Sequence, residues 1–243
     1  MNSKSVVWIV LKDSFLLSSP IFIIKKTFGA HVKHIYSFIF ILFFCSVSYS
    51  QNPCPGVQTV DYGSKTYHTV QISNQCWLKE NLDIGTMINM WHDQINNDFI
   101  EKHCYNNDHE NCKKYGGLYQ WNEAMQYNST LSAQGICPKG WHIPTKREFD
   151  ILAGNYGGNA LKEVDQGSEK GVGTNASGFS ALLSGMSVTT ETFGTLGKGA
   201  FLWSSTESSN THAYNMNLYC KEDDIMFIKI LKGTASSVRC IKD

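Results

Sequence analysis

The stretch Cys137-Pro-Lys-Gly-Trp-His-Ile-Pro-Thr-Lys-Arg-Glu148 decides the expected fold, because it joins a cysteine, a short strand and a helix start. Thr145 and Glu148 have the spacing of a capping box. In such a box the Thr hydroxyl accepts the Glu amide hydrogen, and the Glu carboxylate accepts the Thr amide hydrogen. We therefore predict a helix that begins at Thr145 and ends near the glycines at 154, 157 and 158, which tolerate positive φ.

Upstream of this stretch, the sequence predicts a hairpin and one further helix. Tyr67–Ile72 is rich in β-forming residues, and Gln75–Leu78 can return as its partner strand after a Ser-Asn turn. Gly117–Tyr127 carries apolar residues at i, i+3 and i+7, the pattern of an amphipathic helix.

The C-terminal third of the chain has β character. Five apolar, aromatic or alternating runs lie there: Phe179–Leu183, Phe201–Ser205, His212–Cys220, Ile225–Leu231 and Ser237–Ile241. Their short connections favour antiparallel pairing. The expected fold class is therefore α+β, with two helices early and a mostly antiparallel sheet.

The first fifty residues are typical of a secretory signal peptide. A lysine and a histidine precede the apolar run Ile35–Phe44, and small residues stand before a cut at Gln51. The run is shorter than the roughly 20 residues that span a bilayer, so we expect no permanent membrane span after cleavage. Residues 1–31 are longer than the usual N-terminal region of a signal peptide, and we hypothesise that translation begins at Val32. Residues 51–243 are expected to form one domain.

The charge balance excludes one class of partner. The chain has 21 basic and 21 acidic residues, and residues 1–50 hold five Lys and one Asp. Residues 51–243 therefore keep 16 basic and 20 acidic residues, a net charge of −4. Because no basic stripe is present in the sequence, nucleic acid is not an expected partner.

Export changes the interpretation of the cysteines, since an oxidising compartment favours disulfides. The expected pairs are the local Cys104–Cys112, the hairpin pair Cys54–Cys76 and the long-range Cys137–Cys240, which leaves Cys220 as the free thiol. The alternative is a metal site formed by Cys104, His109 and Cys112, but a fourth ligand at standard spacing is missing from the sequence.

Six stretches in order carry a family resemblance: Thr69–Leu82, Tyr115–Trp121, Gly135–Thr145, Ser177–Leu182, Leu202–Glu207 and Ser237–Asp243. They resemble successive blocks of the Fibrobacter succinogenes major paralogous domain. The resemblance implies an exported protein of a Bacteroidetes-like or Fibrobacter-like bacterium, with a C-type-lectin-like fold akin to formylglycine-generating and sulfatase-modifying domains. It also supports the Cys137–Cys240 pair, but it implies no activity.

The tryptophans divide into two groups. Trp77, Trp121, Trp141 and Trp203 lie in the family blocks, so we expect them in the core. Trp91 lies outside the blocks, in the polar segment Asn89–Gln94, and is the candidate ligand contact. The triplets that hold calcium in C-type lectins are absent from the sequence, and the acidic runs at 106–111 and 222–224 are interpreted as solvated loops.

The expected function is binding without catalysis. The polar segments Asn89–Asn111, Gly157–Asn175 and Ser187–Lys198 separate the blocks, and loops on a rigid frame commonly carry recognition. We expect a secreted or cell-surface domain with an extracellular glycan or protein as ligand, and no cofactor. The alternatives are a structural module of an envelope assembly, or an extracellular enzyme acting on polysaccharide, for which the sequence lacks the common hydrolase and phosphate-loop motifs.

Overall fold

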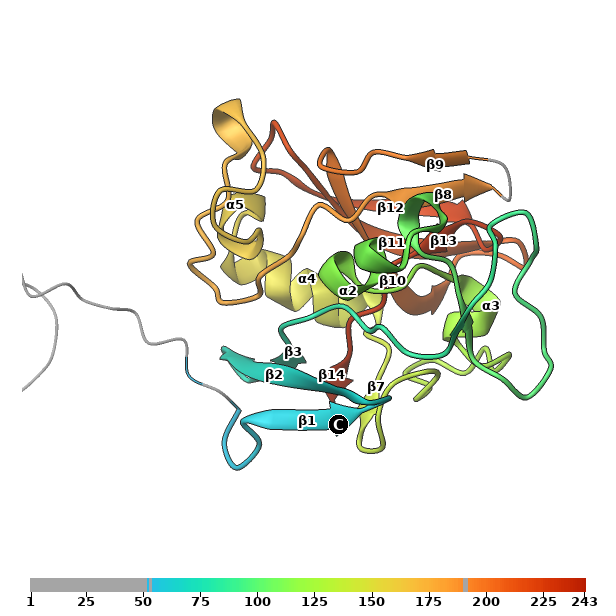
Figure 1. Ribbon diagram of the computed structural model, residues 1–243. Coiled ribbons are helices and arrows are strands. Elements are labelled where there is room, and N and C mark those ends of the chain that lie inside the picture. Colours follow the sequence, from blue (N-terminus) through green and yellow to red (C-terminus); the bar gives the residue numbers. More distant parts are fainter. Residues whose placement is uncertain (1–51, 53, 190–191) are drawn as a thin grey trace, which may run out of the picture. The chain divides into compact units, whose positions relative to one another are not determined.

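The structure, a computed structural model, describes residues 52, 54–189 and 192–243 (Figure 1). The expected signal peptide and the hypothesis of a start at Val32 lie outside these residues. Within the described part of the chain, none of the helices has the length and apolar character needed to cross a membrane.

The first sheet brings the two ends of the described chain together. Its order is β1 (Thr59–Tyr62), β2 (Lys65–Ile72), β3 (Gln75–Leu78), β14 (Ile241–Lys242) and β7 (Trp141–His142). The hairpin of β2 and β3 was predicted and is confirmed. The last strand, β14, pairs antiparallel with β3 on one side and with β7 on the other (Figure 1). The C-terminus therefore lies beside the segment that enters α4.

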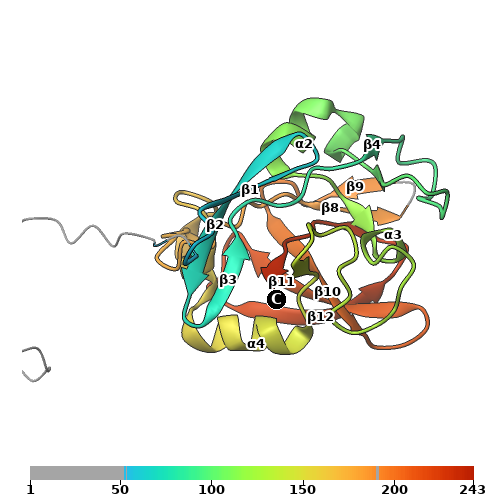
Figure 2. The ribbon, with the colours of Figure 1, turned by 90° about the horizontal axis from the view of Figure 1, so that it is seen from below.

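The second sheet is the predicted antiparallel meander. It consists of β10 (Gly199–Glu207), β11 (His212–Tyr219) and β12 (Ile225–Leu231), in that order. Helix α4 (Lys146–Asn155) packs against β10 and β11 (Figure 2). In the described part of the chain β12 pairs with β11 alone, so its other edge is open.

Two smaller strand groups complete the β structure. One has the order β6 (Tyr119–Gln120), β13 (Ala235–Ser236), β8 (Met186–Thr189) and β9 (Thr192–Gly194). The other is the parallel pair of β4 (Thr86–Met87) and β5 (Glu101–Lys102). The fold is thus α+β and mostly antiparallel, as expected.

The described residues form four short α-helices where the sequence predicted two. They are α2 (His109–Tyr115), α3 (Trp121–Ala124), α4 and α5 (Gly158–Leu161), with 3₁₀ turns η1 (Tyr105–Asn107) and η2 (Glu169–Gly171). The start of α4 is confirmed: the Thr145 hydroxyl accepts the Glu148 amide at 3.2 Å, and the Glu148 carboxylate accepts the Thr145 amide at 2.7 Å.

The predicted helix over Gly117–Tyr127 is wrong in extent. Its first part forms β6, which pairs with β13, and only the four residues of α3 are helical. Gln126 and Tyr127 have φ values of 49° and 57°, a left-handed conformation that stops the helix.

Two predicted strands also differ. Phe179–Leu183 does not extend into a strand, because Ser180 has a φ of 57° and only Ala181 forms a bridge, with Lys162. Ser237–Ile241 does not form one strand: β13 ends just before it at Ser236, Ser237 makes a single bridge with Leu202, and β14 begins at Ile241. The segment expected to be the loop Ser187–Lys198 contains most of β8 and all of β9.

The four tryptophans of the family blocks are buried as expected. Trp77 stacks on Phe149 with ring centroids 5.5 Å apart, and it meets the edge of Phe179 at 5.4 Å. The indole N–H of Trp121 donates to the Ser204 carbonyl, so this polar group is satisfied inside the core.

All three predicted disulfides form. Cys54–Cys76, Cys104–Cys112 and Cys137–Cys240 have Cα separations of 5.6, 5.0 and 5.9 Å, and Cys220 is free and half-buried. The third bridge ties the loop before β7 to the residue before β14. It therefore fixes the middle of the chain to its end.

Candidate functional site

The alternative of a metal site at Cys104, His109 and Cys112 is wrong. The two cysteines are oxidised to a disulfide, so neither can supply a thiolate ligand. Among the described residues, His, Cys, Asp and Glu side chains form no group of three placed to hold a metal ion.

The candidate binding surface is the segment between β4 and β5, residues 88–100, which we call the Trp91 loop. Three large apolar side chains project from it into solvent: Trp91 is 61% exposed, Ile95 56% and Phe99 71%. A groove of about 490 Å³ runs along the loop. Its lining consists of Ile88, Trp91, His92, Asp93, Ile95 and Glu101. The residue chosen from the sequence thus lies at a groove.

The base of the Trp91 loop is closed by strand pairing and by one buried glutamine. The parallel pair of β4 and β5 joins the two ends of the loop. The backbone amide of Gln94 donates to the Gln120 side-chain oxygen at 3.0 Å, and the Gln120 backbone amide donates to the Gln94 side-chain oxygen at 2.8 Å. The Gln94 side chain also donates to the Leu118 carbonyl at 3.1 Å. The middle of the loop is therefore fastened to β6.

His103 lies buried beneath the loop and supports it. One ring nitrogen, Nε2, lies 3.0 Å from the His92 carbonyl, while Nδ1 is buried without a partner among the described residues. Burial lowers the pKa of His103, and this effect outweighs the opposite effect of the hydrogen bond to the His92 carbonyl. The neutral imidazole with its proton on Nε2 therefore donates to the loop backbone.

Two carboxylates help to hold the loop and the strand that follows it. Glu101 accepts from the Ile95 backbone amide at 2.9 Å and from the Asn97 side chain at 3.1 Å. Glu123 accepts from the Glu101 backbone amide at 2.9 Å and from the Tyr127 hydroxyl at 2.9 Å. Burial raises the pKa of Glu123. Both carboxylates are thus bound to the protein itself, and their contacts fix the path of the backbone.

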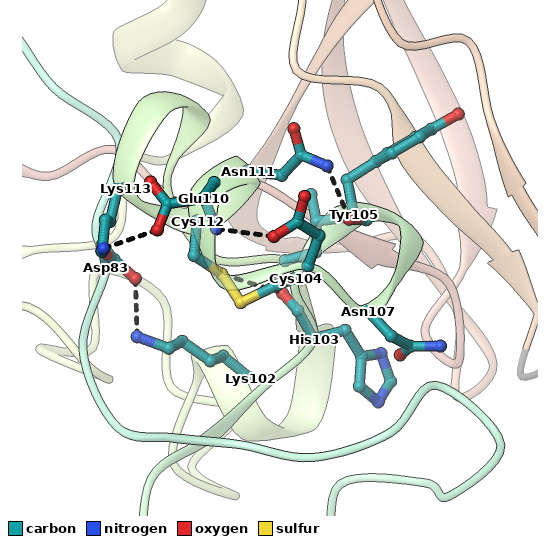
Figure 3. Close-up of a disulfide and its surroundings, with 12 residues drawn as sticks. Asp83, Lys102, His103, Cys104, Tyr105, Asn107, Glu110, Asn111, Cys112 and Lys113 are labelled. Atoms are coloured by element: carbon teal, nitrogen blue, oxygen red, sulfur yellow. Dashed lines mark hydrogen bonds and ion pairs between the residues drawn. A yellow bond between two sulfur atoms is a disulfide. The ribbon is translucent and has the colours of Figure 1, made fainter.

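The disulfide Cys104–Cys112 anchors the neighbouring helix α2 to the end of β5 (Figure 3). Asp108 caps α2 by accepting the Glu110 amide at 2.9 Å, so the acidic run at 106–111 serves as a helix start. Asn107 accepts the Met90 backbone amide at 3.0 Å, which adds a further link to the Trp91 loop.

The other conspicuous titratable cluster surrounds His142. Its Nδ1 lies 2.7 Å from Asp243, and its Nε2 lies 3.1 Å from Glu148. Because Glu148 also closes the capping box of α4, this cluster joins the helix to the C-terminus.

Sequence reasoning did not single out Ile95 and Phe99, which share the exposed surface with Trp91. The available signal was two large apolar residues in the otherwise polar stretch Ile95-Asn-Asn-Asp-Phe99. The predicted loop Gly157–Asn175 carries α5 and η2 and exposes Val164 and Val172. The predicted loop Ser187–Lys198 carries most of β8 and all of β9, and among its described residues it exposes Val188.

Comparison with known proteins gives one match. The model of the Fibrobacter succinogenes major domain matches residues 70–242. Searches of the curated proteins and of the solved structures returned no match.

Proposed function

This chain belongs to the Fibrobacter succinogenes major domain family, and from that starting point we propose that it is a non-catalytic binding domain, secreted or held at the bacterial cell surface. Three disulfides support an oxidising compartment. A C-type-lectin-like frame is part of the proposal, supported by the final strand β14 lying between β3 and β7 and by the covalent tie to Cys137.

The observation that carries the proposal is the contrast within the Trp91 loop. Its backbone amides donate hydrogen bonds to the side chains of Gln120, Glu101 and Asn107, yet three large apolar side chains face solvent. Clustered exposed apolar side chains commonly mark interaction sites. A fixed backbone also lowers the entropy lost on binding, because the loop is already ordered.

The ligand proposed is an extracellular glycan or protein. The Trp91 ring with the polar side chains of His92 and Asp93 beside it in the groove suits a sugar, whose apolar face stacks on an aromatic ring. The exposed Ile95 and Phe99 next to it suit the apolar centre of a protein interface.

Glycan and protein arrays probed with the purified protein test this function. We expect at least one class to bind, and Trp91→Ala to weaken that binding by about tenfold or more, as for a central aromatic contact. The matched control is Leu131→Ala, which truncates another apolar side chain that is 58% exposed but lies outside the loop. Silence on both arrays, or equal loss in the two variants, contradicts the proposal.

A second candidate function, a structural module of an envelope assembly, is favoured by the open edge of β12. Six of its seven residues, Ile-Met-Phe-Ile-Lys-Ile-Leu, are apolar. An open apolar strand edge can pair with a strand of another chain. Cell-surface cross-linking should then capture one stable partner, and Met226→Lys on this edge should abolish the cross-link while Trp91→Ala leaves it unchanged.

A further inference from the structure

A second cavity, of about 230 Å³, is lined by an excess of positive charge. Five cationic side chains contribute to its wall: Lys65, Lys79, Lys113, Lys114 and Arg239. Only two carboxylates, Glu80 and Glu163, lie in the same wall. Lys65 and Lys113 are paired with carboxylates outside the wall, Asp83 at 3.2 Å and Glu110 at 2.6 Å. The rest of the lining, with three cations and two carboxylates, has an excess of one positive charge. It shares no residue with the groove of the Trp91 loop.

Arg239 is the distinctive member of this wall because it is buried without a counter-ion. Its side chain is fully enclosed, and it donates to the Asn81 side-chain oxygen from Nη2 at 2.7 Å and to the Phe179 carbonyl from Nη1. Among the described residues no carboxylate lies within ion-pair distance of its guanidinium. Both acceptors are neutral, and burying a charge that lacks a counter-ion is unfavourable.

The nearby carboxylates are occupied by other groups. Glu80 accepts from the His68 backbone amide and contacts the His68 ring, both at 2.8 Å. Glu163 accepts from the Val164 amide at 2.9 Å and from the Asn175 side chain at 3.2 Å. Burial lowers the pKa of Arg239 to about 9, which still leaves the guanidinium charged at neutral pH. The cavity thus keeps an excess of positive charge at neutral pH.

The rim of the cavity is held in place before any ligand arrives. Lys113 and Lys114 lie in the last turn of α2, which the Cys104–Cys112 disulfide anchors (Figure 3). The Asn81 side chain donates to the Tyr115 carbonyl at 2.9 Å, so the residue that positions Arg239 also fixes the end of α2. The lysines are therefore presented by a rigid element at the mouth of the cavity.

We propose that this cavity binds the carboxylate or sulfate group of an acidic sugar residue. The anion would supply the charge that Arg239 lacks, while the Tyr115 side chain in the wall offers a neutral polar group for a sugar hydroxyl. The small volume suits one sugar residue at the end or side of a chain, since sites for larger ligands begin at about 300 Å³. The site is separate from the Trp91 loop and does not depend on what that loop binds.

The test measures the affinity of the purified protein for tetragalacturonate, for a neutral galactose oligomer of the same length and for inorganic sulfate. We expect the acidic oligomer to bind, and to bind more weakly as salt rises from about 20 to 300 mM. Replacing two rim charges in Lys79→Gln/Lys114→Gln should weaken this binding by about tenfold, because each lysine contributes a partly screened attraction. The matched control, Lys139→Gln, removes an exposed lysine outside the cavity wall and should change nothing.

Five outcomes separate the possibilities. The proposal is supported if the acidic oligomer binds in a salt-dependent way and the double variant weakens that binding. It is also supported if Trp91→Ala binds the acidic oligomer with unchanged affinity, because that result assigns the binding to the cavity. Binding of sulfate without the acidic oligomer supports the anion site and overturns the sugar assignment. Equal affinity for the acidic and neutral oligomers, or equal loss in the double variant and in Lys139→Gln, overturns the site. The rim variants change only lysine side chains at the surface of the fold, so circular dichroism should report native folding for each.

Discussion

Removing Cys137–Cys240 should destabilise the protein more than removing either other disulfide. The three bridges close loops with sequence separations of 103, 22 and 8 residues. In the chain-entropy model, losing them costs about 4.7, about 3.4 and about 2.5 kcal/mol, because a longer cross-linked loop restricts the unfolded chain more. The Cys137/Cys240 and Cys104/Cys112 pairs are both fully buried, so truncating either pair to alanine leaves similar small voids. The difference between these two variants therefore isolates the loop term, about 2 kcal/mol.

The measurement is urea unfolding of the two double Cys→Ala variants, followed by tryptophan fluorescence. With a slope of about 2 kcal/mol per M, the midpoints should differ by about 1 M. The slope itself should rise in the Cys137→Ala/Cys240→Ala variant, since its unfolded chain expands further. Near-ultraviolet circular dichroism checks that both variants begin folded. Equal losses of unfolding free energy in the two variants would refute the reasoning.

Three further predictions concern stability. Trp77→Ala should cost about 3–5 kcal/mol of unfolding free energy because it empties the stack in the core, whereas Trp91→Ala should cost less than about 0.5; urea unfolding compares them. Thr145→Ala should lose about 1 kcal/mol with the capping box, and Lys139→Ala, at an exposed turn, serves as its control. Burial lowers the pKa of His142, but its hydrogen bonds to two carboxylates, Glu148 and Asp243, raise it overall. That stabilisation is complete below about pH 6.5 and is lost as pH rises through the raised pKa, so His142→Gln should flatten the decline in stability above about pH 6.5. If the free energy of unfolding of His142→Gln declines with pH as steeply as that of the unmodified protein, the prediction is contradicted.

Local signals in the sequence predicted the elements whose structure depends on neighbouring residues. The capping box at Thr145 places the start of α4, and the β-rich run Ile225–Leu231 coincides with β12. Helix α2 was missed because it buries only Cys112 and so has no apolar periodicity to detect. The apolar spacing predicted a helix at residues 119 and 120, but their backbone pairs with the distant strand β13. Strand pairing between segments more than a hundred residues apart produces no pattern in the local sequence.

The two candidate sites were predictable to different degrees. Trp91 could be selected because it is a large aromatic residue in a polar segment outside the family blocks. The cavity at Arg239 could not, since its wall collects side chains from positions 65 to 239. The charge of Arg239 becomes unusual only when folding buries it with two neutral acceptors as its hydrogen-bond partners. In the sequence, that arginine is one residue of a motif that ends the sheet.

The contacts that fasten the Trp91 loop have a consequence for how such domains diversify. At residues 91, 95 and 99 the anchoring hydrogen bonds are made by the main-chain amide of each residue, not by its side chain. Mutations at these positions can therefore alter what the domain recognises without redirecting the chain. Paralogues could acquire new specificities by exchanging three outward-facing groups while inheriting the same scaffold unchanged.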